Sequence, residues 1–119
     1  MSYYILDDKK NAVLVGFSRW STWFSDNDDK RKVGLTTLED GMVVSTVFVG
    51  IDISEEGYLF ETLISSKEEC TPDGIIMRYK TWAVAEEGHN EIVENTKRRI
   101  EPKKTKLKKI INRFEFMDL

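Results

Sequence analysis

The sequence of 119 residues has little of what builds disulfides and transition-metal sites: one cysteine, Cys70, and one histidine, His89. A disulfide within the chain is therefore excluded, and a Cys/His metal site would lack ligands. Proline is scarce, and no apolar run approaches the roughly 20 residues of a membrane helix. The first residues also lack the long apolar stretch of a signal peptide. These absences predict a soluble, intracellular, cytoplasmic protein without a cofactor or a metal.

Charge is plentiful but unevenly distributed along the chain. Residues 97–119 contain nine Lys or Arg and three Asp or Glu, whereas residues 1–96 contain nine basic and eighteen acidic residues. We therefore expect an acidic domain over residues 1–100 and a basic extension over residues 101–119. Two interpretations stay open. The extension folds back on the acidic domain, or it contacts nucleic acid or an acidic partner.

Short apolar segments separated by polar turns predict a domain rich in β-strands. The turn Glu39–Gly41 places a glycine where a positive φ is needed, and Ser54–Gly57 is a second turn of this kind. A run of apolar residues from Val43 to Ile51 is typical of a central strand. The predicted strands span residues 3–6, 12–17, 32–38, 42–53, 58–65 and 75–80.

Apolar spacing also predicts helices. Trp20, Trp23 and Phe24 follow i, i+3, i+4 spacing and indicate a short helix. Thr81 is an acceptable N-cap for a longer helix over residues 81–99. Its predicted sheet-facing residues are Trp82, Ala85, Ile92 and Val93. Strands followed by a helix predict the α+β class: an antiparallel meander with a helix packed on one face.

Beyond Pro102, a second helical pattern is set among lysines. Its apolar positions are Leu107, Ile110, Ile111, Phe114 and Met117. We expect residues 103–117 to form an amphipathic helix, which either docks on the domain or offers a basic surface or a dimer contact. The candidate binding residues of this tail are Lys104, Lys108, Lys109 and Arg113.

Four polar residues are candidates for chemistry, although no known catalytic motif is present. His89 is the natural general acid or base, yet helical spacing places it beside the buried face and favours a structural role. Glu61 alternates with apolar residues on a predicted interior strand, where an unpaired carboxylate is costly. A hairpin that pairs Ile64 with Ile75 would place Arg78 opposite Glu61, so we expect an ion pair between them. Asp52 is the fourth candidate.

Two features have a structural and a functional interpretation. Trp20 and Trp23 are candidate binding residues, although tryptophans at helical spacing more often belong to a core. The cluster Asp26–Asp29 resembles a fragment of a calcium loop, but it lacks the spacing and the terminal bidentate glutamate. A solvated turn is therefore the expected structure.

A series of short motifs over residues 18–93 resembles a family. The motifs are Trp20-Ser-Thr-Trp-Phe24, Val44-Ser-Thr-Val-Phe-Val-Gly-Ile-Asp52, Leu59-Phe-Glu-Thr62, Arg78-Tyr-Lys-Thr-Trp82 with Ala85, and Gly88-His89. Together they resemble a group of small proteins encoded by tailed phages and prophages. That family is expected to have a histidine directly after Asp52, where this chain has Ile53. The polar positions that match are then Asp52, Glu61, Arg78 and His89, and the basic tail is an addition.

The resemblance implies a phage accessory protein in the host cytoplasm. By analogy, such a protein binds a host protein or nucleoprotein complex, for example as an inhibitor of a host defence system. Two alternatives stay open. One is a protein that binds a small ligand or hydrolyses it with Glu61, Arg78 and His89. The other is an accessory protein that binds nucleic acid through the basic tail.

Overall fold

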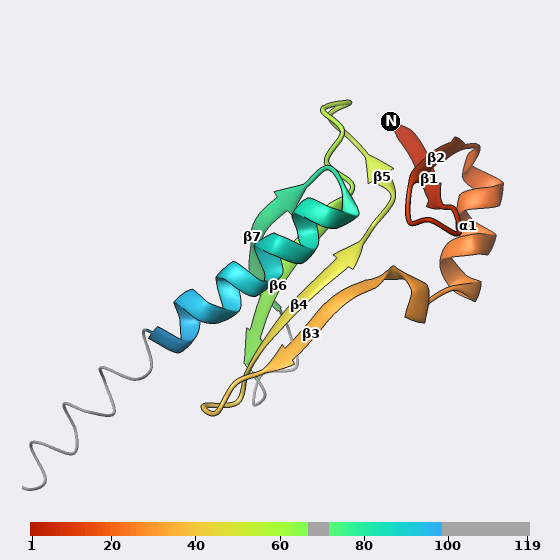
Figure 1. Ribbon diagram of the computed structural model, residues 1–119. Helices are drawn as coiled ribbons and strands as arrows, with labels where there is room; N and C mark the ends of the chain where they lie inside the picture. Colours follow the sequence, from red (N-terminus) through yellow and green to blue (C-terminus); the bar gives the residue numbers. More distant parts are fainter. Residues whose placement is uncertain (67–71, 99–119) are drawn as a thin grey trace, which may run out of the picture.

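The computed structural model describes residues 1–66 and 72–98, which form two antiparallel sheets and two α-helices (Figure 1). The elements are β1 (Ser2–Leu6), β2 (Ala12–Val15), α1 (Phe17–Asp26), the 3-10 turn η1 (Asp29–Arg31), β3 (Lys32–Thr37), β4 (Met42–Phe48), β5 (Ile51–Asp52), β6 (Phe60–Ser66), β7 (Pro72–Tyr79) and a helix over residues 82–98. This arrangement confirms the predicted α+β class.

The larger sheet is the predicted meander, in the strand order β3-β4-β6-β7. Along β4, Val44, Thr46 and Phe48 are buried, whereas the residues between them are half-buried. This period of two is expected when one face of a sheet is covered. Gly41 has a φ of +88° in the turn that joins β3 to β4, as the sequence predicts.

The predicted strand over residues 42–53 is wrong, because the chain changes sheets within it. β4 ends at Phe48, and β5 pairs with β1 in a second sheet of order β2-β1-β5. Gly50, between the two strands, has a φ of +67°. A Cβ at this position would collide with the carbonyl oxygen of Tyr4. Only glycine fits such a close approach of two backbones without strain.

The hairpin between β6 and β7 has irregular pairing. Glu61 lies opposite Arg78, as predicted, but the register shifts on both sides of Leu63. Ile75 therefore pairs with Leu63, and the predicted pairing of Ile75 with Ile64 is wrong. β7 also begins at Pro72, inside the segment predicted as a loop.

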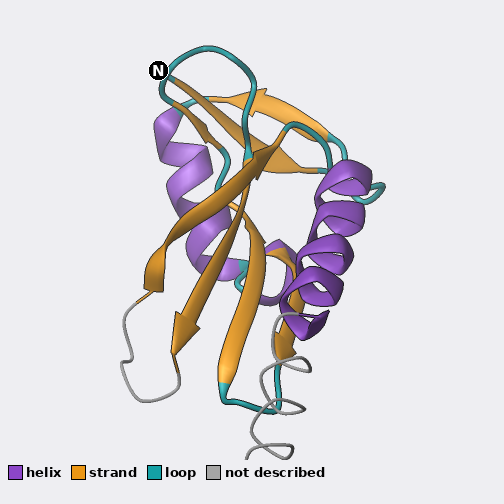
Figure 2. Ribbon diagram, turned by 90° about the vertical axis from the view of Figure 1, so that its left-hand side faces the viewer, coloured by secondary structure: helices purple, strands orange, loops and turns teal. Residues whose placement is uncertain are grey.

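The helix over residues 82–98 covers one face of the larger sheet (Figure 2). The Thr81 hydroxyl oxygen accepts the backbone N–H of Val84 at 3.3 Å, which confirms the predicted N-cap. Near its start, Ala85 packs in a cluster with Phe48, Phe60 and Tyr79, beside the partly buried Trp82. Further along, Val93 packs with Val44 and Leu38, beside Ile92. The four residues predicted to face the sheet are thus confirmed.

At one end of the larger sheet, α1 packs against β1 (Figure 1). The helix is longer than the Trp20–Phe24 pattern suggests, and Trp23 meets Phe48 edge to face at 5.8 Å between ring centroids. In the described part of the chain, neither helix is long and apolar enough to cross a membrane.

Candidate functional site

His89 belongs to a buried chain of hydrogen bonds that crosses the larger sheet. Its Nε2 lies 2.9 Å from the Thr36 hydroxyl, and its Nδ1 lies 2.8 Å from the Thr46 hydroxyl. Thr46 lies 2.6 Å from the hydroxyl of Thr62, which donates to the Tyr79 hydroxyl at 3.0 Å. The helix thus places one imidazole against hydroxyl groups of β3 and β4, and the chain of hydrogen bonds continues through Thr46 to β6 and β7.

The direction of these hydrogen bonds determines the form of the imidazole. Each hydroxyl has one proton, and Thr62 gives its proton to Tyr79, so Thr46 donates to Thr62. Thr46 can then only accept from the Nδ1–H of His89, and Thr36 donates to Nε2. Burial lowers the pKa of His89, which fits this neutral ring. Both nitrogens are satisfied, so the geometry supports a structural histidine.

Two glycines make room for this network. A Cβ at Gly34 would lie 2.7 Å from Cδ2 of His89, and a Cβ at Gly88 would overlap the ring of Tyr79. Helix and sheet therefore approach each other more closely here than larger residues would allow. The ring of His89 has no free nitrogen to offer a ligand.

Asp52 also has a structural contact. It is buried at the end of β5, where its carboxylate accepts the backbone N–H of Gly57 at 2.9 Å. This bond closes the loop over residues 53–57, in which Glu55 and Gly57 have positive φ. A carboxylate that caps a backbone N–H inside a turn is a common way to stabilise a strained loop.

The predicted pair of Glu61 and Arg78 is confirmed, but it is not deeply buried. Glu61 Oε1 lies 3.8 Å from Arg78 Nε, with the side chains 21% and 57% exposed. Both residues extend the row that begins with Val47 on β4, so they lie on the face away from Thr46, Thr62 and His89. The four polar candidates therefore do not form one site. Glu61 and Arg78 lie on one side of the sheet, His89 lies on the other, and Asp52 lies in the second sheet.

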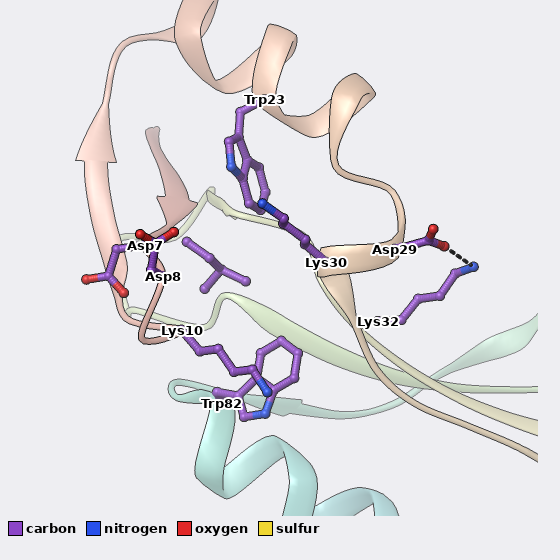
Figure 3. A pocket seen from close by; sticks show the side chains of 9 residues that line it. Asp7, Asp8, Lys10, Trp23, Asp29, Lys30, Lys32 and Trp82 are labelled. Atoms are coloured by element: carbon purple, nitrogen blue, oxygen red, sulfur yellow. Dashed lines mark hydrogen bonds and ion pairs between the residues drawn. The ribbon is translucent and has the colours of Figure 1, made fainter.

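Trp20 and Trp23 have different surroundings. Trp20 donates its indole N–H to the Val49 carbonyl at 3.2 Å and packs in an aromatic cluster with Tyr3, Phe17 and Phe24. Trp23, by contrast, lines a cleft of about 350 Å³ together with Trp82 (Figure 3). We call this space the indole cleft. Of the two tryptophans predicted as binding residues, Trp23 is the one that borders this open space.

Charged residues of both signs surround the indole cleft. Lys10, Lys30 and Lys32 line it, and the Lys10 ammonium lies over the Trp82 ring at 4.3 Å from the centroid (Figure 3). Asp7, Asp8 and Asp29 also line it. Asp7 accepts the backbone N–H groups of Asn11 and Lys9, and the bond from Asn11 is the main reason its pKa is lowered.

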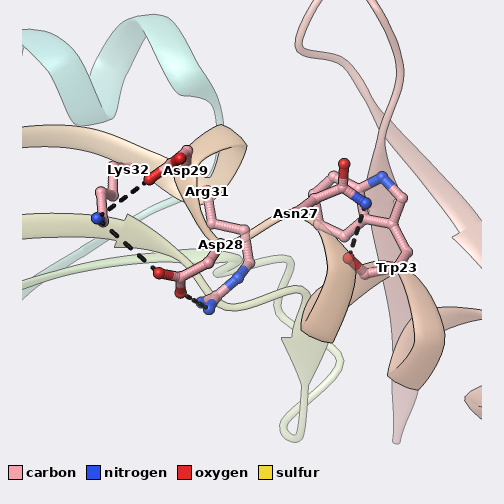
Figure 4. Close-up of polar contacts among 6 residues, drawn as sticks. All are labelled: Trp23, Asn27, Asp28, Asp29, Arg31 and Lys32. Atoms are coloured by element: carbon pink, nitrogen blue, oxygen red, sulfur yellow. Dashed lines mark hydrogen bonds and ion pairs between the residues drawn. The ribbon is translucent and has the colours of Figure 1, made fainter.

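Within the Asp26–Asp29 cluster at the end of α1, Asp28 and Asp29 pair with cations of the chain (Figure 4). Asp28 pairs with Arg31 at 2.7 Å, and Asp29 pairs with Lys32 at 3.4 Å. The side chain of Asn27 donates to the carbonyl of Trp23 at 2.8 Å. Within residues 1–66 and 72–98, no three His, Cys, Asp or Glu side chains gather as metal ligands would.

On the far side of Trp82 lies a second hollow of about 320 Å³, which we call the lysine hollow. Lys9, Lys10 and Lys80 line it beside Thr81 and Trp82, and no described lining residue is acidic. Sequence reasoning missed these residues. The lysines at positions 9, 10, 30, 32 and 80 are visible in the sequence. Nothing in their spacing indicates that they lie around the indole of Trp82.

The face of the larger sheet away from the helix carries the exposed Leu35 and the half-buried Val43, Val47 and Leu63. We call it the open face. Besides Glu61 and Arg78, its residues are Leu35, Thr37, Val43, Ser45, Val47, Leu63 and Ser65, as strand register and alternation place them, and Lys32 pairs with Val47 at its edge. Leu35 is 64% exposed, and no helix of the described part packs on this face. An antiparallel sheet that faces water normally alternates to polar residues on that side.

The tail residues Lys104, Lys108, Lys109 and Arg113, and the predicted helix over residues 103–117, lie outside the described residues. No family model, curated protein or solved structure matches the chain. The described surfaces and the sequence resemblance are therefore what supports a function.

Proposed function

We propose that this protein is a phage-encoded accessory protein that acts in the host cytoplasm by binding a host protein through the open face. The phage origin rests on the resemblance of residues 18–93. An inhibitor of a host defence system is one concrete form of this function. The observation that carries the binding role is that the described centre of the open face has one charged pair, Glu61 and Arg78, in a protein in which 33% of the residues are charged.

The composition of the open face favours a protein over a nucleic acid as its partner. Leu35, Ser45 and Leu63 form one uncharged row across three strands, and the row of Thr37, Val43 and Ser65 beside it is also uncharged. The cores of protein interfaces are depleted in charge in the same way. Nucleic acid, in contrast, needs several Lys or Arg to neutralise its phosphates. Among the described residues of this face, Arg78 pairs with Glu61, and Lys32 at the edge pairs with Asp28 and Asp29.

The positions of Glu61, Arg78 and His89 help to decide between a binding surface and a ligand-binding or hydrolytic site. A ligand-binding or hydrolytic site built from Glu61, Arg78 and His89 would need these side chains on one side of the sheet. The ion pair and the histidine instead lie on opposite faces. Binding by a surface is the function that the geometry supports better.

A capture experiment with matched variants tests the proposal. The tagged full chain is used to isolate its partner from infected host cells, in parallel with Leu35→Lys and Val84→Lys. Val84 is a suitable control because it is also exposed, by 51%, but lies on the helix side. We expect Leu35→Lys to lose the captured protein and Val84→Lys to keep it. Equal capture by both variants would contradict the proposal.

Two further measurements separate the open face from its rivals. If Leu35→Lys instead halves the mass measured in solution, the open face binds a second copy of this chain and the proposal is wrong. A chain truncated after Pro102 should keep the partner. Loss of the partner on truncation would place the contact in the basic tail, in agreement with the nucleic-acid alternative.

A further inference from the structure

The lysine hollow concentrates positive charge in an acidic part of the chain. Residues 1–96 contain nine Lys or Arg and eighteen Asp or Glu. Three of these nine, Lys9, Lys10 and Lys80, line one hollow of about 320 Å³ that no described carboxylate lines. The Lys10 ammonium lies over the Trp82 ring and the Lys80 ammonium lies 5.1 Å from the centroid of Tyr58, and both side chains are long enough to turn toward an anion in the hollow. The hollow is therefore suited to a compact anion.

The surroundings of the lysines add hydrogen-bond donors. The Thr81 side chain borders the hollow, and Ala83, in the first helical turn, lines it as well. Hydroxyl and ammonium donors together match the several acceptor oxygens of a phosphate group. The positive end of the helix adds modestly to this attraction, but the lysines and the enclosed space are what define the site.

An aromatic surface lies directly beside these donors. The indole of Trp82 borders both the lysine hollow and the indole cleft. The orientation of the Trp82 ring is fixed, because its indole N–H donates to Glu86 at 3.1 Å and the ring packs edge to face against Phe60. One face carries the ammonium of Lys10, which belongs to a flexible side chain that a planar ring can displace. A fixed indole beside a cationic hollow is the combination that binds a base together with its phosphate.

We propose that the lysine hollow and Trp82 form a binding site for a nucleotide unit. The phosphate lies between Lys9, Lys10 and Lys80, and the base stacks on the Trp82 indole. The same chemistry is offered by a free mononucleotide and by one unit of a single-stranded nucleic acid. This site is separate from the open face and does not depend on the proposed protein partner.

Binding is measured by titration calorimetry with the full chain and four probes: AMP, ribose 5-phosphate, inorganic phosphate and a short oligo-dT. We expect AMP to bind at least about fivefold more tightly than ribose 5-phosphate, because stacking of a base on an aromatic side chain contributes about 1–3 kcal/mol. Affinity should fall as salt is raised. Tighter binding of oligo-dT than of AMP would identify single-stranded nucleic acid as the source, and the reverse order would identify a free nucleotide.

Substitutions of single residues test whether AMP binds in the lysine hollow. Lys80→Ala should weaken AMP about tenfold, the loss expected for one hydrogen bond to a charged group. The control Lys97→Ala, which lies near the far end of the helix over residues 82–98 and pairs with Glu94 at 3.6 Å, should not change the affinity. Trp82→Phe keeps a ring in the core and should reduce the preference for AMP over ribose 5-phosphate. The proposal is wrong if no probe binds, or if Lys80→Ala and Lys97→Ala have equal effects.

Discussion

Replacing Gly88 by alanine is a change for which helix propensity and packing predict opposite results. Gly88 lies within the helix over residues 82–98, where alanine is favoured over glycine by about 1 kcal/mol. A Cβ at this position, however, would lie only 2.5 Å from Cζ and 2.6 Å from the hydroxyl oxygen of Tyr79. These separations are about 1 Å shorter than ordinary contacts between carbon atoms.

The clash has two ways to relax, and both are costly. If the helix moves outward, it loosens the core around Ala85, and overpacking of this kind costs typically about 1–3 kcal/mol. If the ring of Tyr79 turns away, it loses the bond from Thr62 at 3.0 Å, which contributes about 1 kcal/mol. After the gain in propensity of about 1 kcal/mol is subtracted, we therefore expect Gly88→Ala to lower the free energy of unfolding by about 0–2 kcal/mol.

Urea unfolding of the variant, followed by tryptophan fluorescence, measures this difference. Asn90→Ala is the matched control, because Asn90 is exposed on the same helix and alanine should raise stability there by a few tenths of a kcal/mol. A Gly88→Ala chain that is more stable than the original chain by about 1 kcal/mol, as helix propensity alone predicts, would refute the close packing of helix and sheet.

Three further predictions concern the polar contacts. Because burial lowers the pKa of His89 below its ordinary 6.5, the unfolded chain binds the extra proton more readily. The contribution of His89 to the free energy of unfolding should therefore be constant above pH 6.5 and decrease as the pH falls below 6.5. In unfolding curves measured at several pH values, His89→Gln should reduce this decrease in stability at low pH. Thr46→Val removes the hydroxyl between His89 and Thr62 and should cost about 1–3 kcal/mol in urea unfolding, with the fold unchanged by circular dichroism. Glu61→Gln should cost less than about 1 kcal/mol, because Arg78 is 57% exposed; a loss of several kcal/mol would mean that the pair is shielded from water.

The parts of the fold that depend on local pattern were predictable from the sequence. The meander, the Thr81 cap and the sheet-facing residues of the helix follow from turns and periodicity within short windows. The pairing of Glu61 with Arg78 was predicted correctly, although the regular register from which it was derived fails nearer the turn, where the pairing shifts on both sides of Leu63. The break at Gly50 was not predictable, since the apolar run continues through it and the backbone that excludes a side chain there belongs to Tyr4, far away in the sequence.

The candidate sites depend on contacts that no local pattern contains. The position of His89 near the buried face was predictable, but its partners Thr36 and Thr46 come from strands more than 40 residues earlier. The lysine hollow joins the β1–β2 turn to the start of the helix at residue 82, and each segment alone has the charge of an ordinary exposed turn. The open face could not be recognised from the sequence, because the apolar residues of β4 are equally compatible with a strand that is buried on both faces.

Site-specific photo-crosslinking tests the central claim most directly. A photo-reactive amino acid is placed at Leu35 on the open face, and in a second protein at Val84, which is also exposed but lies on the helix. In infected host cells, the open-face position should crosslink to one host protein and the helix position should not. Crosslinking of that protein only from position 84, or of position 35 only to a second copy of the chain, would contradict the proposed function.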